Sequence, residues 1–299
     1  MPIYSTTYVA AFLGSCALAC AMPPANAGQR APGGVIAFAS NRDGDTEIYV
    51  MNPNGTGVRR LTHSRKYDSP TAWSPNGRRL LFYSQRGASG DVWVMNSDGS
   101  GQRNLTRNPA GDGGGSWSRD GAQIAFNSDR SGNGDIYLVN ADGSGTRKLT
   151  DDPANDEQPA WSPDGSSIAF VSDRDSASEI FVMNADGSAQ RGLTAGAKDS
   201  LPVWSPNGRM LAFVRIAAGK ASIYVMNSDG SAQRQVIRDR KDWISGLSWS
   251  PDSRRLAFSS GRDQEAGELY LVSIDGKRLM RLTTNRFGDN DPVWSRALG

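Results

Sequence analysis

Short apolar runs, separated by polar stretches that favour turns, follow one another along the chain from residue 35 onward. One stretch shows the pattern well: Ile168–Val171 and Ile180–Met183 are apolar at consecutive positions, and Ser-Pro-Asp-Gly and Asp-Gly turns lie around them. Consecutive rather than alternating apolar residues predict short strands that are buried on both faces. With the tryptophan-containing segment before them and Arg191–Thr194 after them, these runs predict a unit of four short strands.

The unit repeats at a period that is typical of propeller blades. One tryptophan marks each copy, and the successive spacings are 44, 44, 43, 45 and 45 residues for Trp73, Trp117, Trp161, Trp204, Trp249 and Trp294. A repeat of about 40–45 residues is that of a four-stranded blade. The second apolar strand occurs six times, at Val35–Ser40, Leu80–Ser84, Ile124–Ser128, Ile168–Ser172, Leu211–Arg215 and Leu256–Ser260. The sequence therefore predicts an all-β fold, a six-bladed propeller of four-stranded antiparallel blades.

The two ends of the repeat predict how the ring closes. The repeat begins at a second strand, with no tryptophan strand before it, and it ends on the tryptophan strand Asp291–Ser295. Pairing of the two ends in one blade would remove the free edge of an open stack. We expect the propeller to span residues 35–295, with a short tail at 296–299.

The first 34 residues differ from the repeats. An apolar run, Val9–Met22, precedes Ala25-Asn26-Ala27, which is typical of a signal peptidase site. This predicts a signal peptide at residues 1–27, a linker at 28–34 and a periplasmic protein. The alternative is an envelope lipoprotein anchored through Cys16, because Leu13-Gly14-Ser15-Cys16 loosely matches a lipobox.

The amino-acid composition argues against several classes of function. The 33 basic and 31 acidic residues are spread along the chain, which gives no reason to expect nucleic-acid binding. No segment after residue 30 is long and apolar enough to cross a membrane.

Both cysteines, Cys16 and Cys20, lie in the predicted signal peptide, and His63 is the only histidine. Nucleophilic Ser/His/Asp or Cys/His catalysis and a multi-histidine metal site are therefore not expected, and the chain is predicted to have no enzymatic activity. It is also predicted to be a monomer.

Two charged positions recur around the hairpin between the second and third strands. An arginine follows the second strand at Arg42, Arg86, Arg130, Arg174 and Arg262. An acid precedes the third strand at Glu47, Asp91, Asp135, Glu179 and Glu268. Both are missing from one blade, where Ala217 and Ser222 stand, so we expect them to pair with each other, with a value of about 0–1 kcal/mol if exposed.

The fourth strand carries a repeated arginine, at Arg59, Arg103, Arg147, Arg191 and Arg234. The sequence predicts that this charge protects an exposed outer edge from pairing with another sheet.

An aspartate stands five residues before the tryptophan in five blades, at Asp68, Asp112, Asp156, Asp199 and Asp289, and Ile244 replaces it in the sixth. Asp199 persists in the blade without the loop arginine, which argues against that arginine as its partner. Because the aspartate begins the innermost strand, the five carboxylates are expected to face the central channel, where they could bind Ca²⁺ or a cationic group of a partner. The more ordinary interpretation is that each aspartate caps its own loop by accepting backbone N–H bonds.

The repeated tryptophans also allow two interpretations. Six indoles could stack on carbohydrate, but a large aromatic residue at one inner position of every blade favours packing between blades. Trp243 is outside this pattern and lies in the irregular connection Arg240–Trp243, so it is a candidate contact for a partner. The acidic loop Asn41–Glu47 lacks the spacing of an EF-hand.

The full unit resembles the repeat of the TolB-type six-bladed propeller family. The resemblance rests on Pro159–Gly165, Ile168–Phe170, Ser172–Arg174, Val182–Gly187 and Leu193-Thr194, and its elements recur over residues 35–295. It implies a non-enzymatic propeller of the cell envelope that binds other proteins, as TolB binds the lipoprotein Pal. TolB itself carries an α/β domain before its propeller, whereas only residues 28–34 separate the predicted cleavage site from the first strand here.

A function of another class is the alternative. A propeller hydrolase or lactonase would use a divalent cation in the central channel, whereas the interaction module needs no cofactor. Ca²⁺ is the cation that the aspartates would favour.

Overall fold

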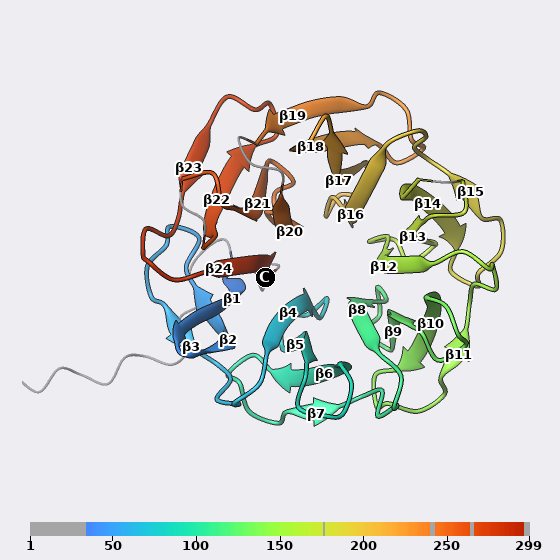
Figure 1. Ribbon diagram of the computed structural model, residues 1–299, viewed down its shortest axis with the longest axis horizontal. Coiled ribbons are helices and arrows are strands. Elements are labelled where there is room, and N and C mark those ends of the chain that lie inside the picture. Colours follow the sequence, from blue (N-terminus) through green and yellow to red (C-terminus); the bar gives the residue numbers. More distant parts are fainter. Residues whose placement is uncertain (1–33, 176, 240–242, 264–265, 296–299) are drawn as a thin grey trace, which may run out of the picture. The chain divides into compact units, whose positions relative to one another are not determined.

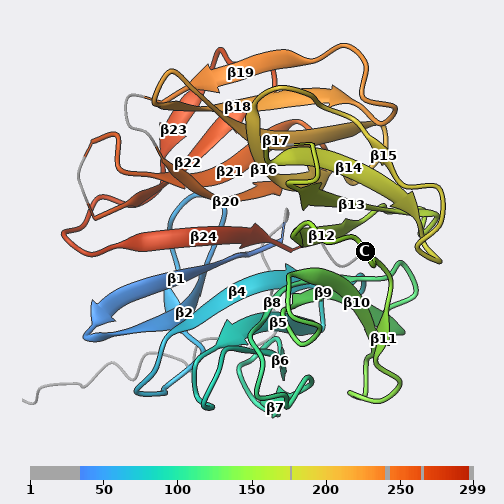
Figure 2. The same ribbon diagram turned by 45° about the vertical axis from the view of Figure 1, so that its right-hand side comes forward.

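The computed structural model describes residues 34–175, 177–239, 243–263 and 266–295. They form six four-stranded antiparallel sheets arranged in a ring, and the ring surrounds a central axis (Figures 1 and 2). The predicted all-β, six-bladed propeller is confirmed. In this part of the chain no helix has the length and apolar character needed to cross a membrane.

Each blade has four strands, counted from the axis outward. The innermost strands are β24 (Asp289–Trp294), β4 (Asp68–Trp73), β8 (Asp112–Trp117), β12 (Asp156–Trp161), β16 (Lys198–Trp204) and β20 (Ile244–Trp249). The second strands are β1 (Ile36–Asp43), β5 (Arg79–Ser84), β9 (Gln123–Ser128), β13 (Ser167–Ser172), β17 (Met210–Ala217) and β21 (Arg255–Ser260). The third strands are β2 (Asp45–Met51), β6 (Asp91–Asn96), β10 (Asp135–Asn140), β14 (Glu179–Asn184), β18 (Lys220–Asn227) and β22 (Glu268–Ser273). The outermost strands are β3 (Arg59–Arg60), β7 (Arg103–Asn104), β11 (Arg147–Lys148), β15 (Arg191–Gly192), β19 (Arg234–Arg238) and β23 (Leu279–Arg281). We number the blades 1 to 6 in this order.

Blade 1 closes the ring. Its innermost strand, β24, comes from the C-terminal end of the repeat and pairs antiparallel with β1, with Ile36 opposite Trp294 and Ser40 opposite Asp289. The Val35 N–H donates to Ser295 Oγ at 2.8 Å, and the Ser295 N–H donates to the Val35 carbonyl at 2.8 Å. The predicted closure by the C-terminal strand is confirmed.

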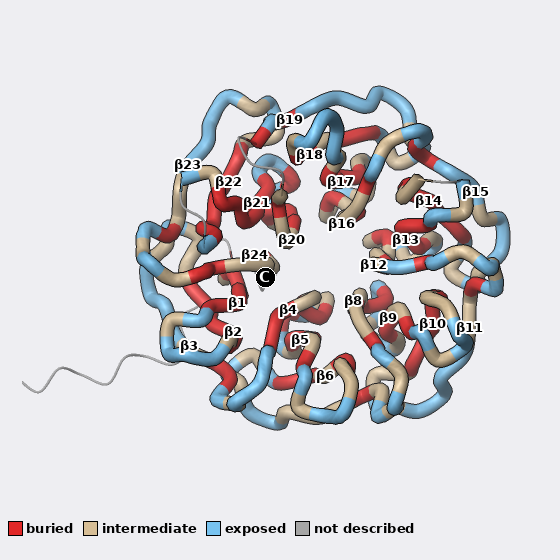
Figure 3. Tube along the Cα trace, in the orientation of Figure 1, coloured by how far each residue is buried: buried red, intermediate tan, exposed pale blue. Residues whose placement is uncertain are grey.

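The core lies inside the blades and between them, and the exposed residues lie mainly along the outer rim (Figure 3). In every blade a fully buried second-strand phenylalanine packs on an aromatic ring of the third strand, with ring centroids 5.5–6.0 Å apart. Trp93, which stands outside the tryptophan repeat, is the third-strand ring of blade 2 and packs on Phe82. Such aromatic pairs add to the free energy gained by burial.

The repeated tryptophans lie at the ends of the innermost strands and join adjacent blades. The indole N–H of Trp204 donates to the Ala160 carbonyl of the preceding blade at 3.1 Å, and Trp73, Trp117 and Trp249 make the equivalent bond at 3.0–3.3 Å. Trp161 differs, because its indole nitrogen is buried without a hydrogen-bond partner in the described part of the chain. The indoles thus serve as contacts between blades.

The outermost arginines also join blades. Arg103 donates to the carbonyls of Ala141 and Asp142 in the following blade at 2.9 and 2.7 Å. Arg234 donates in the same way to the Ile274 carbonyl at 2.8 Å. In addition to any protection of the outer edge, these arginines therefore form bonds across the gap between blades.

The predicted signal peptide at 1–27, Cys16 with it, most of the linker at 28–34 and the tail at 296–299 lie outside the described residues and stay predictions.

Candidate functional site: the mouth of the central channel

The five repeated aspartates lie at the start of the innermost strands and are buried, with at most 1% of their surface exposed. Each forms an ion pair inside its own blade, at N–O distances of 2.5–2.9 Å: Asp68 with Arg86, Asp112 with Arg130, Asp156 with Arg174, Asp199 with Arg215, and Asp289 with Arg42. The expectation that five free carboxylates face the channel is therefore not met. The structure also differs from the loop-capping interpretation, because the partner of each carboxylate is a guanidinium group.

The arginines of these pairs lie over the aromatic rings of the core. The guanidinium carbon of Arg130 is 5.2 Å from the centre of the Phe126 ring and 4.9 Å from that of Tyr137. The Arg130 Nε also donates to Ser128 Oγ at 2.8 Å. A buried ion pair is tolerated only with such additional hydrogen bonds and close geometry. The aspartates therefore support the blades, and their charge is already neutralised.

In two blades the same kind of Arg–Asp ion pair is formed by residues at other positions of the repeat. In blade 5 the loop arginine is replaced by Ala217, and Arg215, two residues earlier, pairs with Asp199 through two hydrogen bonds of 2.7 and 2.8 Å. In blade 6 the aspartate is replaced by Ile244, and Asp239, from the end of the preceding blade, lies 3.3 Å from Arg262. The inference that the loop arginine is not the partner of the repeated aspartate is wrong, because four of the five aspartates pair with it and Asp199 pairs with a substitute arginine. We call these six Arg–Asp pairs the ion-pair ring.

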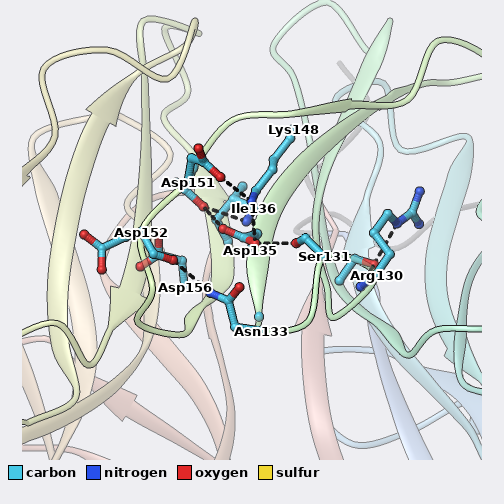
Figure 4. Close-up of polar contacts among 12 residues, drawn as sticks. Arg130, Ser131, Asn133, Asp135, Ile136, Lys148, Asp151, Asp152 and Asp156 are labelled. Atoms are coloured by element: carbon cyan, nitrogen blue, oxygen red, sulfur yellow. Dashed lines mark hydrogen bonds and ion pairs between the residues drawn. The ribbon is translucent and has the colours of Figure 1, made fainter.

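The acids before the third strands bind elsewhere, so the predicted pairing with the loop arginines is also wrong. Glu268 accepts from Arg281 at 2.9 Å, and Asp135 lies 3.0 Å from Lys148. Figure 4 shows Lys148 between Asp135 and Asp151, with Ser131 on the other side of the Asp135 carboxylate. These acids connect the third strand to the fourth strand and to the loop that leads to the next blade.

Trp243 is partly buried at the start of blade 6. A Cβ atom added to Gly267 would lie 3.1 Å from Trp243 Cη2, so the indole lies against the backbone of the hairpin loop in its own blade. Trp243 does not line the channel cavity described below. The neighbouring residues 240–242 lie outside the described part of the chain.

The innermost strands share a β-bulge shortly before the tryptophan, where the pairing register with the second strand shifts. In five blades the unpaired stretch begins three residues before the tryptophan, and in blade 2 it begins one residue later, because Pro70 still pairs with Phe82. We call the positions three residues before the tryptophan the bulge ring: Pro70, Gly114, Gln158, Leu201, Gly246 and Asp291. All except Pro70 have a left-handed backbone, with φ between 52° and 67°. This conformation is unfavourable for Gln158 and Leu201 and is better tolerated by Asp291, and strained backbone of this kind is often found at functional sites.

The bulges lie around a cavity of about 390 Å³ at the end of the channel where the innermost strands begin. Tyr67 and Tyr83 of blade 2 also line it. A second cavity of about 240 Å³ continues towards the tryptophans, and both share Thr71, Pro159, Pro202 and Leu247 as a common wall. We call the larger cavity the channel mouth.

The polar groups of the channel mouth gather around Asp291. The Ser69 hydroxyl donates to Asp291 Oδ2 at 2.8 Å, and the Tyr67 hydroxyl lies 3.5 Å from the same oxygen. Burial and the Asp291 carboxylate raise the pKa of Tyr67 to about 12, so its hydroxyl stays protonated. Gly246 allows blade 6 to approach this group, because a Cβ atom there would lie 2.4 Å from Asp291 Cα.

The walls of the channel mouth are largely apolar, and among the residues that the structure describes Asp291 is the single charged one that lines it. Across the described ranges, no three or more His, Cys, Asp or Glu side chains come together in a way that could hold a metal ion. Apolar walls with a few convergent polar groups are typical of a binding site.

The channel mouth could not be predicted from the sequence, because the bulge ring has five different residue types at its six positions. The one available signal was the proline that follows the bulge position in three blades, at Pro159, Pro202 and Pro292.

Comparisons with known proteins agree with the fold. The family model described as "TolB beta propeller domain" matches residues 25–111, 69–238 and 113–298. The chain is 46% identical over 54 residues to the Tol-Pal system protein TolB of Geobacter sulfurreducens, which is 18% of this chain and 12% of that protein. It is 45% identical over 47 residues to the uncharacterized peptidase YuxL of Bacillus subtilis, which is 16% of this chain and 7% of that protein. The matches thus span a small part of these curated relatives.

Two solved structures show the range of proteins with this fold. The crystal structure of TolB from Acinetobacter baumannii has a TM-score of 0.80 at 20% identity, and the match covers 88% of this chain and 67% of that chain. An oligogalacturonate lyase from Vibrio parahaemolyticus has a TM-score of 0.57 at 16% identity, with 84% and 74% covered. At these identities the likeness concerns the fold alone.

Proposed function

Because this chain belongs to the TolB beta-propeller domain family, we propose that it is an exported, non-enzymatic interaction module that binds another cell-envelope protein at its channel mouth. The single observation that carries the proposal is the combination of a cavity of about 390 Å³ with strained, non-glycine side chains that line it. Each such conformation costs about 1–3 kcal/mol and persists only where the surrounding structure enforces it, which happens often at binding sites.

A periplasmic location and a Pal-like lipoprotein partner belong to this proposal. The predicted signal peptide supports export, and the name of one relative, the Tol-Pal system protein TolB, supports a partner of that kind. Within this proposal the propeller acts as a monomer, and the partner inserts a segment into the channel mouth.

A pull-down of envelope proteins with the mature chain tests this function. The Leu201→Arg variant places a long charged side chain in the channel mouth, because Leu201 lines the cavity. The Leu279→Arg variant is the matched control, since Leu279 is 44% exposed on β23 at the outer rim. We expect Leu201→Arg to lose the captured protein and Leu279→Arg to keep it. Capture that is equal for both variants would refute binding at the channel mouth.

The alternative function is a hydrolase or lactonase that uses a divalent cation in the channel. A propeller of similar fold, an oligogalacturonate lyase, has a solved structure in complex with manganese, and that match has a TM-score of 0.57. Calorimetric titration of the mature protein with Ca²⁺ and Mn²⁺ separates the two functions. Stoichiometric binding that is lost in Asp291→Asn would favour the enzyme.

A further inference from the structure

Among the described residues of the channel mouth, none carries a charge opposite to that of Asp291. The other described residues that line the cavity are uncharged, and Pro70, Leu201, Leu247 and Val293 provide apolar wall. Within the described ranges no Lys, Arg or His forms an ion pair with Asp291, and the two hydrogen bonds to its carboxylate come from the neutral hydroxyls of Ser69 and Tyr67. An ionised carboxylate in an apolar cavity is stabilised strongly by an opposite charge.

The contrast with the ion-pair ring strengthens this point. Asp289, two residues earlier on the same strand, is buried and paired with Arg42 at 2.9 Å. Within the described ranges a guanidinium group therefore pairs with every repeated aspartate of the innermost strands, and none pairs with Asp291. The Asp291 carboxylate is thus suited to pair with a cation of a bound partner.

Two tyrosines make the surroundings of Asp291 suitable for a cation. The rings of Tyr67 and Tyr83 meet edge to face, with centroids 6.1 Å apart, and both line the cavity. Tyrosine ring faces attract an ammonium group. The protonated Tyr67 hydroxyl adds no second negative charge, and its oxygen can accept a hydrogen bond from the cation.

We propose that the channel mouth binds a lysine side chain of the partner polypeptide, with the ammonium group on Asp291 and the alkyl stem along the apolar wall. This inference rests on the proposed function. Lysine fits better than arginine, because Asp291 Oδ2 already accepts from Ser69 and Tyr67 and leaves one oxygen, Oδ1, for the guest. A compact ammonium group needs one such oxygen, whereas a guanidinium group binds best to both oxygens of a carboxylate.

NMR titration of the isotope-labelled mature protein tests the proposal. The probes are N-acetyl-lysine-N-methylamide and its norleucine analogue, which has the apolar stem without the ammonium group. We expect the lysine probe to bind at least tenfold more tightly and to shift the resonances of Tyr67, Ser69 and Leu201. Equal binding of the two probes, or shifts located outside the channel mouth, would overturn the proposal.

Two variants complete the test. Asp291→Asn removes the charge but still offers an acceptor to the Ser69 hydroxyl, and asparagine also tolerates the left-handed backbone at this position. We expect this variant to bind the lysine probe at least tenfold more weakly. Glu157→Gln removes one exposed charge next to the bulge residue Gln158, outside the cavity, and should leave binding unchanged. Equal loss in both variants would mean a general effect of negative charge and would contradict the proposal.

The pull-down then separates the two ideas. If Leu201→Arg abolishes capture while Asp291→Asn retains it fully, the channel mouth binds a partner but not through a lysine, and only this inference fails. If neither variant affects capture, the proposed function fails as well.

Discussion

The innermost strands carry two rings of side chains, only two residues apart, that follow opposite rules. The ion-pair ring is the same in all six blades, and where the sequence departs from the repeat, another residue restores the pair. The bulge ring has five different residue types at six positions, and nothing restores a common one. In this propeller, therefore, repetition marks what holds each blade together, and variation marks the residues that line the channel mouth, where we propose that a partner binds.

The restored pairs show what the fold requires. Arg215 replaces a loop arginine from within β17, and Asp239 replaces an aspartate of β20 from the preceding connection. In both blades the substitute residue stands at another position in the sequence, yet an Arg–Asp ion pair is still formed beside the start of the innermost strand. An unpaired charge buried at this site would be too costly.

Loss of the strand that closes the ring should have the largest effect. Deletion of residues 289–299 removes β24, and with it one ion pair, one tryptophan and the pairing partner of β1. We expect the cooperative thermal transition to disappear in calorimetry. Deletion of residues 296–299 alone is the control and should keep the transition; an unchanged transition in the longer deletion would refute closure by β24.

Breaking one member of the ion-pair ring should have the next largest effect. Arg174→Met leaves Asp156 buried without its guanidinium partner, so we expect a loss of about 3–5 kcal/mol in the free energy of unfolding. Urea denaturation measures this loss. The double variant Arg174→Met/Asp156→Leu should recover much of the stability, because two apolar residues leave no buried charge. A single variant that loses less than the double variant would contradict the buried-pair explanation.

A smaller difference should separate two tryptophans of adjacent blades. Trp204→Phe removes an indole N–H bonded to the Ala160 carbonyl at 3.1 Å, whereas Trp161→Phe removes one that has no hydrogen-bond partner among the residues described. Both variants lose similar ring volume, so Trp204→Phe should cost about 1 kcal/mol more in the free energy of unfolding. Equal values in matched urea denaturation experiments would mean that the bond between blades contributes nothing.

A substitution in the bulge ring should change the free energy of unfolding least. Leu201→Gly relieves a left-handed backbone of φ 55° and gives up a partly buried side chain, and the two effects oppose each other. We expect the free energy of unfolding to change by no more than about 1 kcal/mol, while capture of the partner weakens. A large loss of stability with normal capture would assign Leu201 to the core rather than to the binding site.

The strands and their order could be predicted because they depend on local, repeated patterns. The second strand expected at Ile168–Ser172 is β13, Ser167–Ser172, and the expected pairing of the two ends is the observed pairing of β24 with β1. The partners of the charges could not be predicted in the same way. Arg130 and Asp135 are close in sequence, yet Arg130 binds Asp112, 18 residues away, because both lie at the same end of adjacent strands in the blade.

The channel mouth depends still more on tertiary structure. The amino-acid sequence by itself determined a closed ring of six blades, since every blade repeats the same alternation of apolar strands and turns. Only the tertiary structure decided that Gln158, Leu201 and Asp291 line one cavity and that the five aspartates do not. The reason is physical: a shift of register at each bulge sets which side chains point to the axis, and closure of the ring brings together six strands that are distant in the chain.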